Sequence, residues 1–263
     1  MKQKIPKIIH YCWFGHNSLT PLAKRCILSW QKYCPDYKIV EWNEENFDIN
    51  AWEYTKEAYA CKKWAFVSDV ARLVALNTHG GIYLDTDVEI IKNIDDLQNY
   101  DAFSGFESRS DIAAGVMASL PHHRFIEELL KQYDSDHFMR NDGSLNQYTI
   151  VRRMTTLLKK YGLEGNNALQ TVAGITLFPQ DYFYPKDRDT KQLVITRNTY
   201  MIHHYDGSWL TEEDNYINFL RENMKKVFPV CLAGYLAKYV GVTKYHGFLQ
   251  ANRQLFGWLC RKK

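Results

Sequence analysis

The sequence predicts an α/β fold with a mostly parallel central sheet, flanking helices and a helical C-terminal appendage. Two observations indicate this class. Short apolar runs alternate with helix-like segments, and a pair of glycines separates a long helical pattern from a buried apolar run. A chain of 263 residues is long enough for one large domain of this kind with a smaller attachment. We expect a first domain at residues 1–212 and a second at residues 213–263.

The first expected elements are a strand, a helix and a second strand. Residues 7–13 are mostly apolar, which predicts a buried strand. Pro21 then opens a helix that ends near Tyr33, because proline suits the first helical position. Alternation of apolar and polar residues at 37–42 predicts the second strand.

A long, largely apolar helix from about residue 64 to residue 78 comes next. Gly80 and Gly81 end it, since glycine is the usual stop signal of a helix, and a short strand follows at once. The remaining expected strands lie at 102–106, 112–118, 176–178 and 200–204, and the remaining helices at 124–133, at 145–161 and from 213 onward.

Two carboxylates, Asp85 and Asp87, directly follow the strand after the glycine pair. They are two positions apart, so in extended backbone both project from the same side. Like charges this close repel unless a cation lies between them, and Mg²⁺ or Mn²⁺ prefers oxygen ligands and often accompanies a phosphate. Strand ends are also where α/β sheets bind ligands. The pair predicts a divalent metal site, with a solvated loop as the ordinary alternative.

The composition argues against several classes of protein. The formal net charge of +3 is near neutral, which argues against nucleic-acid binding. The six cysteines are scattered without a Cys-x-x-Cys pair, which favours neither a zinc site nor a disulfide framework. The first residues lack the apolar core of a signal peptide, and no apolar run reaches membrane-spanning length. We therefore expect a cytoplasmic setting.

Three further clusters contain residues suited to ligand binding. Trp13, Phe14 and Gly15 follow the first strand, where an aromatic ring could stack on a nucleobase and glycine would let the backbone approach it; the alternative is that Trp13 is core. Asp69 and Arg72, with Ser68 beside them, share one face of the apolar helix. A buried Asp and Arg need specific partners, so a ligand role competes with an ordinary ion pair there.

The third of these clusters is the pair His203 and His204, followed closely by Ser208 and Trp209. Imidazole is a good ligand for Mn²⁺, so one of the histidines could complete a metal shell with the two carboxylates. Adjacent residues on a strand face opposite sides, so at most one of them can do so.

These clusters together resemble the Asp-x-Asp sugar transferases of glycosyltransferase family 32. That family contains bacterial capsular-polysaccharide enzymes and yeast Golgi mannosyltransferases, and it is similar at greater distance to the clostridial glucosylating toxins. The matching segments run in the family's order from Ile5 to Trp209: residues 5–15, Ser68-Asp69-x-x-Arg72, Gly80-Gly81-Ile82-Tyr83-Leu84-Asp85-Thr86-Asp87, and His203-His204-x-x-Gly207-Ser208-Trp209.

The resemblance implies a GT-A fold and transfer of a hexose from a nucleotide sugar with retention of configuration. It implies Mn²⁺ or Mg²⁺ as cofactor, a glycan or lipid-linked oligosaccharide as acceptor, and a role in capsular or exopolysaccharide synthesis. By analogy we favour a UDP-sugar over GDP-mannose.

The resemblance also implies residue roles. Trp13, with Phe14 and Gly15, would hold the donor's base. Asp69 and Arg72, with Ser68, would hold the donor sugar. Asp85 would contact ribose or sugar and Asp87 would bind the metal. His203 or His204, with Ser208 and Trp209, would close over the diphosphate, and we prefer His204 as metal ligand because His-x-x-Gly resembles the ligand motif of related retaining transferases.

The C-terminal segment combines basic and aromatic residues. No acidic residue follows Glu222, whereas eight basic residues do. Basic amphipathic helices with aromatics are typical of membrane-surface elements, so we expect peripheral contact at the inner face of the plasma membrane. A helical cap that packs on the main domain is the alternative.

Two other functions compete with sugar transfer. A phosphatase of the haloacid dehalogenase type also has an apolar strand that ends in Asp-x-Asp, but its motif lies near the N-terminus and a later acidic motif is not found here. A non-catalytic carbohydrate-binding module would not need a metal site of the diphosphate type.

Overall fold

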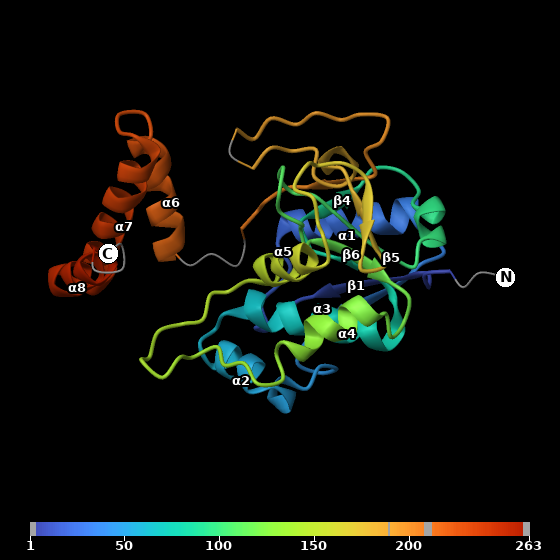
Figure 1. Cartoon of the computed structure of the whole chain (residues 1–263), viewed down its shortest axis with the longest axis horizontal. Helices are drawn as coiled ribbons and strands as arrows, with labels where there is room; N and C mark the ends of the chain where they lie inside the picture. The colour runs from blue at the N-terminus through green and yellow to red at the C-terminus, as the bar shows by residue number, and fades with distance from the viewer. Residues whose placement is uncertain (1–3, 189, 208–211, 260–263) are drawn as a thin grey trace. The chain divides into compact units, whose positions relative to one another are not determined.

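The computed structural model describes residues 4–188, 190–207 and 212–259. They form two compact units, Met1–Asp206 and Gly207–Lys263, which are described separately (Figure 1). The division lies a few residues before the boundary expected between residues 212 and 213.

The first unit is built on a mixed seven-stranded sheet in the order β2-β1-β3-β6-β5-β8-β7. Its strands are β1 (Ile8–Cys12), β2 (Lys38–Trp42), β3 (Gly81–Leu84), β5 (Ala102–Gly105), β6 (Val116–Ser119), β7 (Gln170–Val172) and β8 (Ile175–Phe178). The predicted α/β class is confirmed, and the sheet is mixed, with β1, β2, β3, β5 and β8 in one direction and β6 and β7 in the other. The pairs β1–β2, β1–β3 and β5–β8 are parallel, whereas β6 runs antiparallel to both β3 and β5, and β7 antiparallel to β8.

Helices cover both faces of the sheet, with α1 on one side and α3 and α4 on the other (Figure 1). Apolar side chains of α2 to α5 build one core, and α1 with the segment around Phe183 builds the other. The helices of this unit are α1 (Pro21–Tyr33), α2 (Glu53–Ala60), α3 (Trp64–His79), α4 (Arg124–Lys131) and α5 (Ile150–Lys160), with 3₁₀ turns at Ile49–Ala51, Asp95–Asn99 and Gln180–Tyr182.

The glycine pair after α3 is required by the backbone. Gly80 and Gly81 have φ of +62° and +100°, and a Cβ on Gly81 would lie 2.7 Å from the carbonyl oxygen of Ile8. The buried ring of His10 fixes the same turn: its Nε2 donates to Gly80 O at 2.9 Å, while its Nδ1 accepts from Trp42 Nε1. Burial lowers the pKa of His10 to about 4, so the ring is neutral at physiological pH. The turn that aims β3 toward its carboxylates is therefore held rigidly.

Strand directions bring several chain segments to one edge of the sheet. β1, β2 and β3 are parallel, and because β6 is antiparallel to both β3 and β5, β5 and β8 run in the same direction as β3. The residues that follow β1, β3 and β5 therefore meet at the carboxyl edge.

A second, two-stranded sheet adds a distant segment to this edge. β4 (Val88–Ile90) pairs antiparallel with β9 (Met201–His203), with Val88 opposite His203. Residues 201–203 are thereby placed beside the segment that follows the Asp-x-Asp turn.

Two expected elements differ from the structure. The helix expected from residue 145 begins only at Ile150, because the side-chain amide of Asn146 bonds Asp136 and the carbonyl of His137 and holds the preceding segment as a loop. The strand expected at 112–118 is extended only from Val116, and Ile112 instead makes an isolated bridge with Phe106.

The described residues of the second unit form three helices: α6 (Glu212–Met224), α7 (Val230–His246) and α8 (Phe248–Leu259). α6 and α7 approach closely at Gly241, where a Cβ would collide with Ile217. No helix among the described residues is long and apolar enough to cross a membrane.

Candidate functional site

Asp85, Asp87 and His203 form a compact cluster at the carboxyl edge. Their ligand atoms all lie within 4.8 Å of one another, and no other group of three or more such side chains is found among the described residues. His203 Nε2 lies 3.2 Å from Asp87 Oδ1 and 3.9 Å from Asp85 Oδ2. The β4–β9 pairing creates the cluster, because it places His203 opposite the residue that follows Asp87.

Each carboxylate of the cluster uses one oxygen to bind the protein and turns the other toward His203. Asp85 Oδ1 accepts from the Tyr83 hydroxyl at 2.9 Å and lies 3.3 Å from Arg72 NH1. Asp87 Oδ2 accepts from the backbone N–H of Asp206 at 2.8 Å. The remaining oxygens, Asp85 Oδ2 and Asp87 Oδ1, are the two that face the imidazole. This division is typical of metal sites, in which outer groups orient the ligands.

The charged groups of the cluster shift one another's pKa values. Burial alone would raise the pKa of Asp87, but the charge of His203 and hydrogen bonds from His203 and the Asp206 backbone lower it to about 2. Burial alone would lower the pKa of His203, but Asp87 and Asp85 raise it. Asp87 and His203 therefore stabilise each other's charged forms, and a cation that binds here would take the place of the proton on His203.

The donor set and the space around it fit a divalent ion. Two carboxylate oxygens and one imidazole nitrogen suit Mn²⁺, and oxygen-rich sites also take Mg²⁺. Gly115 lies directly behind them: a Cβ there would be 2.9 Å from Asp85 Oδ2 and 3.3 Å from His203 Nε2. A side chain at this position would displace the ligands, so the site depends on a glycine that the sequence analysis did not single out.

The preference for His204 as the metal ligand is wrong in this structure. Its Nε2 lies 2.8 Å from Glu89 Oε2, and its backbone N–H donates to the carbonyl of Asp87. Because neighbouring residues of a strand project to opposite sides, placing His203 in the cluster turns His204 away from it.

Arg72 is buried and fully engaged with the protein. Its NH2 lies 3.2 Å from Asp69 Oδ1, while its NH1 donates to Ala114 O at 2.8 Å and also lies near Asp85. The guanidinium also stacks 4.5 Å from the centre of the Tyr83 ring. Both Arg72 and Asp69 are only 6% exposed. The structure therefore places this pair behind Asp85 as its support; contact with a donor sugar stays a prediction.

Trp13 and Ser68 lie close to this edge. Trp13 follows β1 and is half-buried, and its indole nitrogen donates to Asn17 O at 2.6 Å, which fixes the ring. Ser68 is also half-buried, and its hydroxyl donates to Trp64 O within α3. Their roles in ligand binding stay predictions.

Phe14 and Gly15 serve the fold. Phe14 is 4% exposed and packs edge-on against Phe47, so its ring is not available to a ligand. Gly15 has φ of +94°, and a Cβ would lie 2.6 Å from the ring of Trp64. A close approach of a ligand to the backbone of Gly15 was predicted, but the ring of Trp64 occupies that space. Ser208 and Trp209, also predicted site residues, lie outside the described residues.

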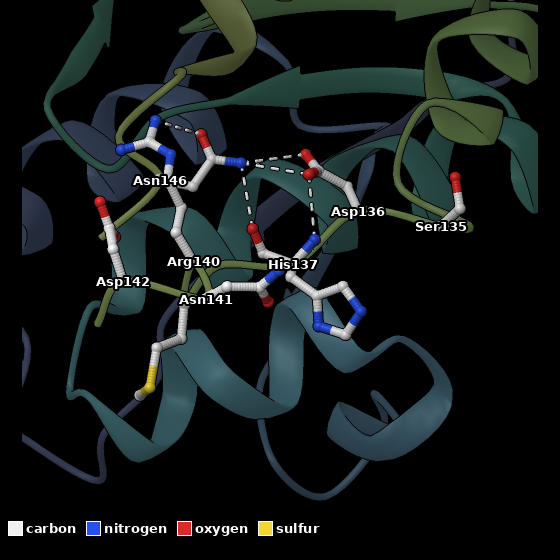
Figure 2. A pocket seen from close by; sticks show the side chains of 8 residues that line it. Ser135, Asp136, His137, Arg140, Asn141, Asp142 and Asn146 are labelled. Atoms are coloured by element: carbon white, nitrogen blue, oxygen red, sulfur yellow. Dashed lines mark hydrogen bonds between the residues drawn. The ribbon is translucent and has the colours of Figure 1, made fainter. Parts of the chain in front are cut away.

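A surface pocket lies on the loop between α4 and α5, apart from the predicted site residues. Figure 2 shows Asp136, Arg140 and Asn146 lining it. The end of this loop reaches the buried support of the cluster, because the N–H of Ile150 donates to Asp69 Oδ2 at 3.2 Å. The pocket is thus tied to the cluster through Asp69 and Arg72.

Tyr83 and Asp206 are further site residues that the sequence analysis missed. Tyr83 could have been predicted, because it is a hydrogen-bonding residue in an otherwise aliphatic strand that leads directly to two carboxylates. Asp206 contributes only its backbone N–H, for which a sequence contains no signal.

We predict that His203→Ala lowers Mn²⁺ affinity by at least about 10-fold, since even outer-shell changes commonly cost that much. The matched variant His204→Ala should leave it unchanged, because that ring faces Glu89. Calorimetric titration of Mn²⁺ in the presence of a nucleoside diphosphate measures both. Loss of affinity in the His204 variant alone would contradict the assignment.

Comparison with known proteins identifies the region that contains the cluster's carboxylates. Residues 21–104 match the family described as "Glycosyltransferase sugar-binding region containing DXD motif". Inositol phosphoceramide mannosyltransferase 3 of Schizosaccharomyces pombe is 30% identical over 139 residues, which cover 48% of this chain and 36% of that protein. The lactosylceramide 4-alpha-galactosyltransferase of Rattus norvegicus is 27% identical over 120 residues, 45% of this chain and 31% of that one.

A relative of similar size is the uncharacterized glycosyltransferase L373 of Acanthamoeba polyphaga mimivirus. It is 25% identical over 217 residues, which cover 78% of this chain and 84% of that protein. The chain spans only about a third of the length of the first curated relatives it matches, 36% of the mannosyltransferase above. None of these matches is a phosphatase or a carbohydrate-binding module. Residues 21–104 are thus similar to the sugar-binding region of the DXD glycosyltransferases, the enzyme class that the sequence resembles.

Proposed function

We propose that this protein is a retaining, metal-dependent glycosyltransferase of the GT-A type that moves a hexose from a nucleotide sugar to a glycan acceptor. The observation that carries the proposal is the pair of carboxylate oxygens, Asp85 Oδ2 and Asp87 Oδ1, that converge on His203 Nε2 in a segment similar to a DXD sugar-binding region. Retention of configuration rests on the family resemblance.

The chain's own residues hold and orient the ligands. Asp87 and His203, with Asp85, would hold Mn²⁺ or Mg²⁺, which when bound stabilises the negative charge that develops on a departing diphosphate. Arg72 and Tyr83 keep Asp85 turned toward the site. Because these contacts are already made, little reorganisation is needed when a donor binds.

Other residues have proposed roles at the two ends of the donor. Trp13, fixed through Asn17 at the same edge, would stack on the base. Ser208 and Trp209 follow His203 in the chain and would close over the diphosphate. A UDP-sugar is the favoured donor by analogy, although the relatives' names include both a mannosyltransferase and a galactosyltransferase.

The acceptor that we propose is a lipid-linked oligosaccharide, as in capsular or exopolysaccharide synthesis. Two relatives are named for ceramide acceptors, inositol phosphoceramide and lactosylceramide, which supports a lipid-borne acceptor in general terms. The second unit supports the same class of acceptor, because it combines basic residues with exposed apolar side chains: Phe219, Val227, Phe228, Leu232, Tyr245, Phe248 and Leu249.

We predict that Asp87→Asn lowers Mn²⁺-dependent turnover of the donor by at least about 100-fold. A metal supplies several kcal/mol of charge stabilisation, and each 1.36 kcal/mol is a factor of ten in rate. A thermal-shift panel of nucleotide sugars with and without Mn²⁺ selects the donor, and release of nucleoside diphosphate measures turnover.

The matched control for this variant is Asp36→Asn. Asp36 is 77% exposed and precedes β2, at the opposite edge of the sheet, so turnover should be unchanged. Equal turnover by wild type and the Asp87 variant would refute the mechanism.

We further propose that the second unit contacts anionic membranes at the inner face of the plasma membrane. Phe248 and Leu249, where α7 gives way to α8, are 61% and 79% exposed. Basic residues near an anionic leaflet add attraction on the order of 1 kcal/mol each. Apolar side chains that enter the interface add to it.

We predict that replacing Phe248 and Leu249 by serine lowers co-sedimentation of the full chain with anionic vesicles by at least about fivefold, since burial of two large apolar side chains is lost. Leu28→Ser is the control, because Leu28 is 63% exposed but lies on α1 of the first unit. Unchanged sedimentation of the double variant, or an equal loss in both, would argue against membrane contact by this unit.

A further inference from the structure

A third carboxylate, Glu107, lies at the same edge of the sheet and has no role in the proposed chemistry so far. It is the second residue after β5, which runs parallel to β3 with only β6 between them. The backbone N–H of Glu107 donates to Asp111 O, and that of Ala113 donates to Gly105 O, so the loop that carries Glu107 is pinned on both sides.

Glu107 follows β5 at the same carboxyl edge of the sheet as the metal cluster. It is half-buried, and burial raises its pKa. After burial, the strongest influences on it are the charges of His203 and Arg188, which lower the pKa, and those of Asp111 and Asp85, which raise it. The Asp85–His203 side of the cluster is therefore within electrostatic reach of Glu107.

No structural role accounts for this carboxylate. No side-chain hydrogen bond or ion pair joins Glu107 to the residues that the structure describes, although Asp85, Asp87 and Asp69 all have such partners. A partly buried charge without partners is unfavourable. Such a group is explained when its partner is a ligand.

Two tyrosines complete the surroundings of Glu107. The rings of Tyr184 and Tyr205 lie 5.5 Å and 4.3 Å from the ring of His203, centre to centre. For both hydroxyls the largest charge influence, after burial, is Glu107, and it raises their pKa. The carboxylate is therefore within electrostatic reach of both hydroxyls, as it is of His203.

Tyr205 shows two further signs of a binding role. Its hydroxyl is buried without a hydrogen-bond partner among the described residues. Its backbone has φ of +56°, an uncommon and strained conformation for an aromatic residue. Backbone strain of this kind persists where the surrounding structure imposes it, and it is common at functional sites.

We propose that Glu107 and Tyr205 bind the sugar of the donor, with the Glu107 carboxylate accepting hydrogen bonds from sugar hydroxyls and the Tyr205 hydroxyl supplying a donor. Sugar hydroxyls both donate and accept, so an unpaired carboxylate and an unpaired phenol are complementary to them. The sugar is attached to the diphosphate, and Glu107 lies on the β5 side of the cluster that would hold the diphosphate. This inference rests on the proposed function.

The test separates the affinity for the sugar from the affinity for the diphosphate. Binding of UDP and of the UDP-hexose selected by the donor panel is measured with Mn²⁺ for wild type, Glu107→Gln and Tyr205→Phe. We expect Glu107→Gln to bind UDP as wild type does and to bind the UDP-hexose at least about 10-fold more weakly, the usual effect of removing a charged hydrogen-bond partner. Tyr205→Phe should show a smaller loss of the same kind.

Asp111→Asn is the matched control, because it removes one negative charge from the same loop but its exposed carboxylate bonds Ser108. It should bind both compounds as wild type does. Equal UDP-hexose affinity in wild type and Glu107→Gln would overturn the inference and leave the proposed function intact. Loss of UDP binding in Glu107→Gln would also overturn it, since the carboxylate would then support the metal cluster. A wild-type protein that binds no nucleotide sugar with Mn²⁺ would overturn the proposed function itself.

Discussion

The buried guanidinium of Arg72 is the contact on which the site depends. It lies between the carboxylates of Asp69 and Asp85, over the ring of Tyr83, and it donates to the carbonyl of Ala114. Removing an arginine and an aspartate from water is costly unless every donor finds a partner, and here the partners come from α3, β3 and the segment before β6. The charge is retained in the fold because Tyr83, Asp85 and Asp69 raise the pKa of Arg72 despite its burial.

This network explains how the cluster is preorganised. Arg72 and Tyr83 hold one oxygen of Asp85, and the N–H of Asp206 holds one oxygen of Asp87, so each carboxylate directs its other oxygen toward His203. The same arginine connects outward through Asp69 to the start of α5 and its preceding loop. A change in that loop can therefore reach the metal ligands through a short chain of buried polar contacts.

The sequence predicted the parts of the fold that depend on local patterns. The glycine pair after α3 was recognised because only glycine suits its two left-handed backbone conformations, and Asp85 and Asp87 were placed correctly because they follow a strand with an unambiguous start. The similarity of residues 21–104 to the sugar-binding region of DXD glycosyltransferases was likewise expected from the order of the motifs.

Features that depend on distant pairing could not be predicted in the same way. Whether His203 or His204 faces Asp87 is decided by the register of β9 against β4, more than a hundred residues away in the chain. Phe14 was predicted to help hold the donor's base. Its packing against Phe47 could not be foreseen, because nothing in the sequence indicates that the two rings meet. Glu107 was overlooked because nothing nearby marks it. It comes close to the Asp85–Asp87 turn only because β6 lies between β3 and β5 and is antiparallel to both.

The account is tested most directly by a crystal structure with Mn²⁺ and a nucleoside diphosphate, with data collected at a wavelength where manganese scatters anomalously. We expect one anomalous peak at bonding distance from Asp87 and His203 Nε2, beside Asp85 Oδ2 and over Gly115. A peak between His204 and Glu89, or no peak at the carboxyl edge while the diphosphate is bound there, would contradict it.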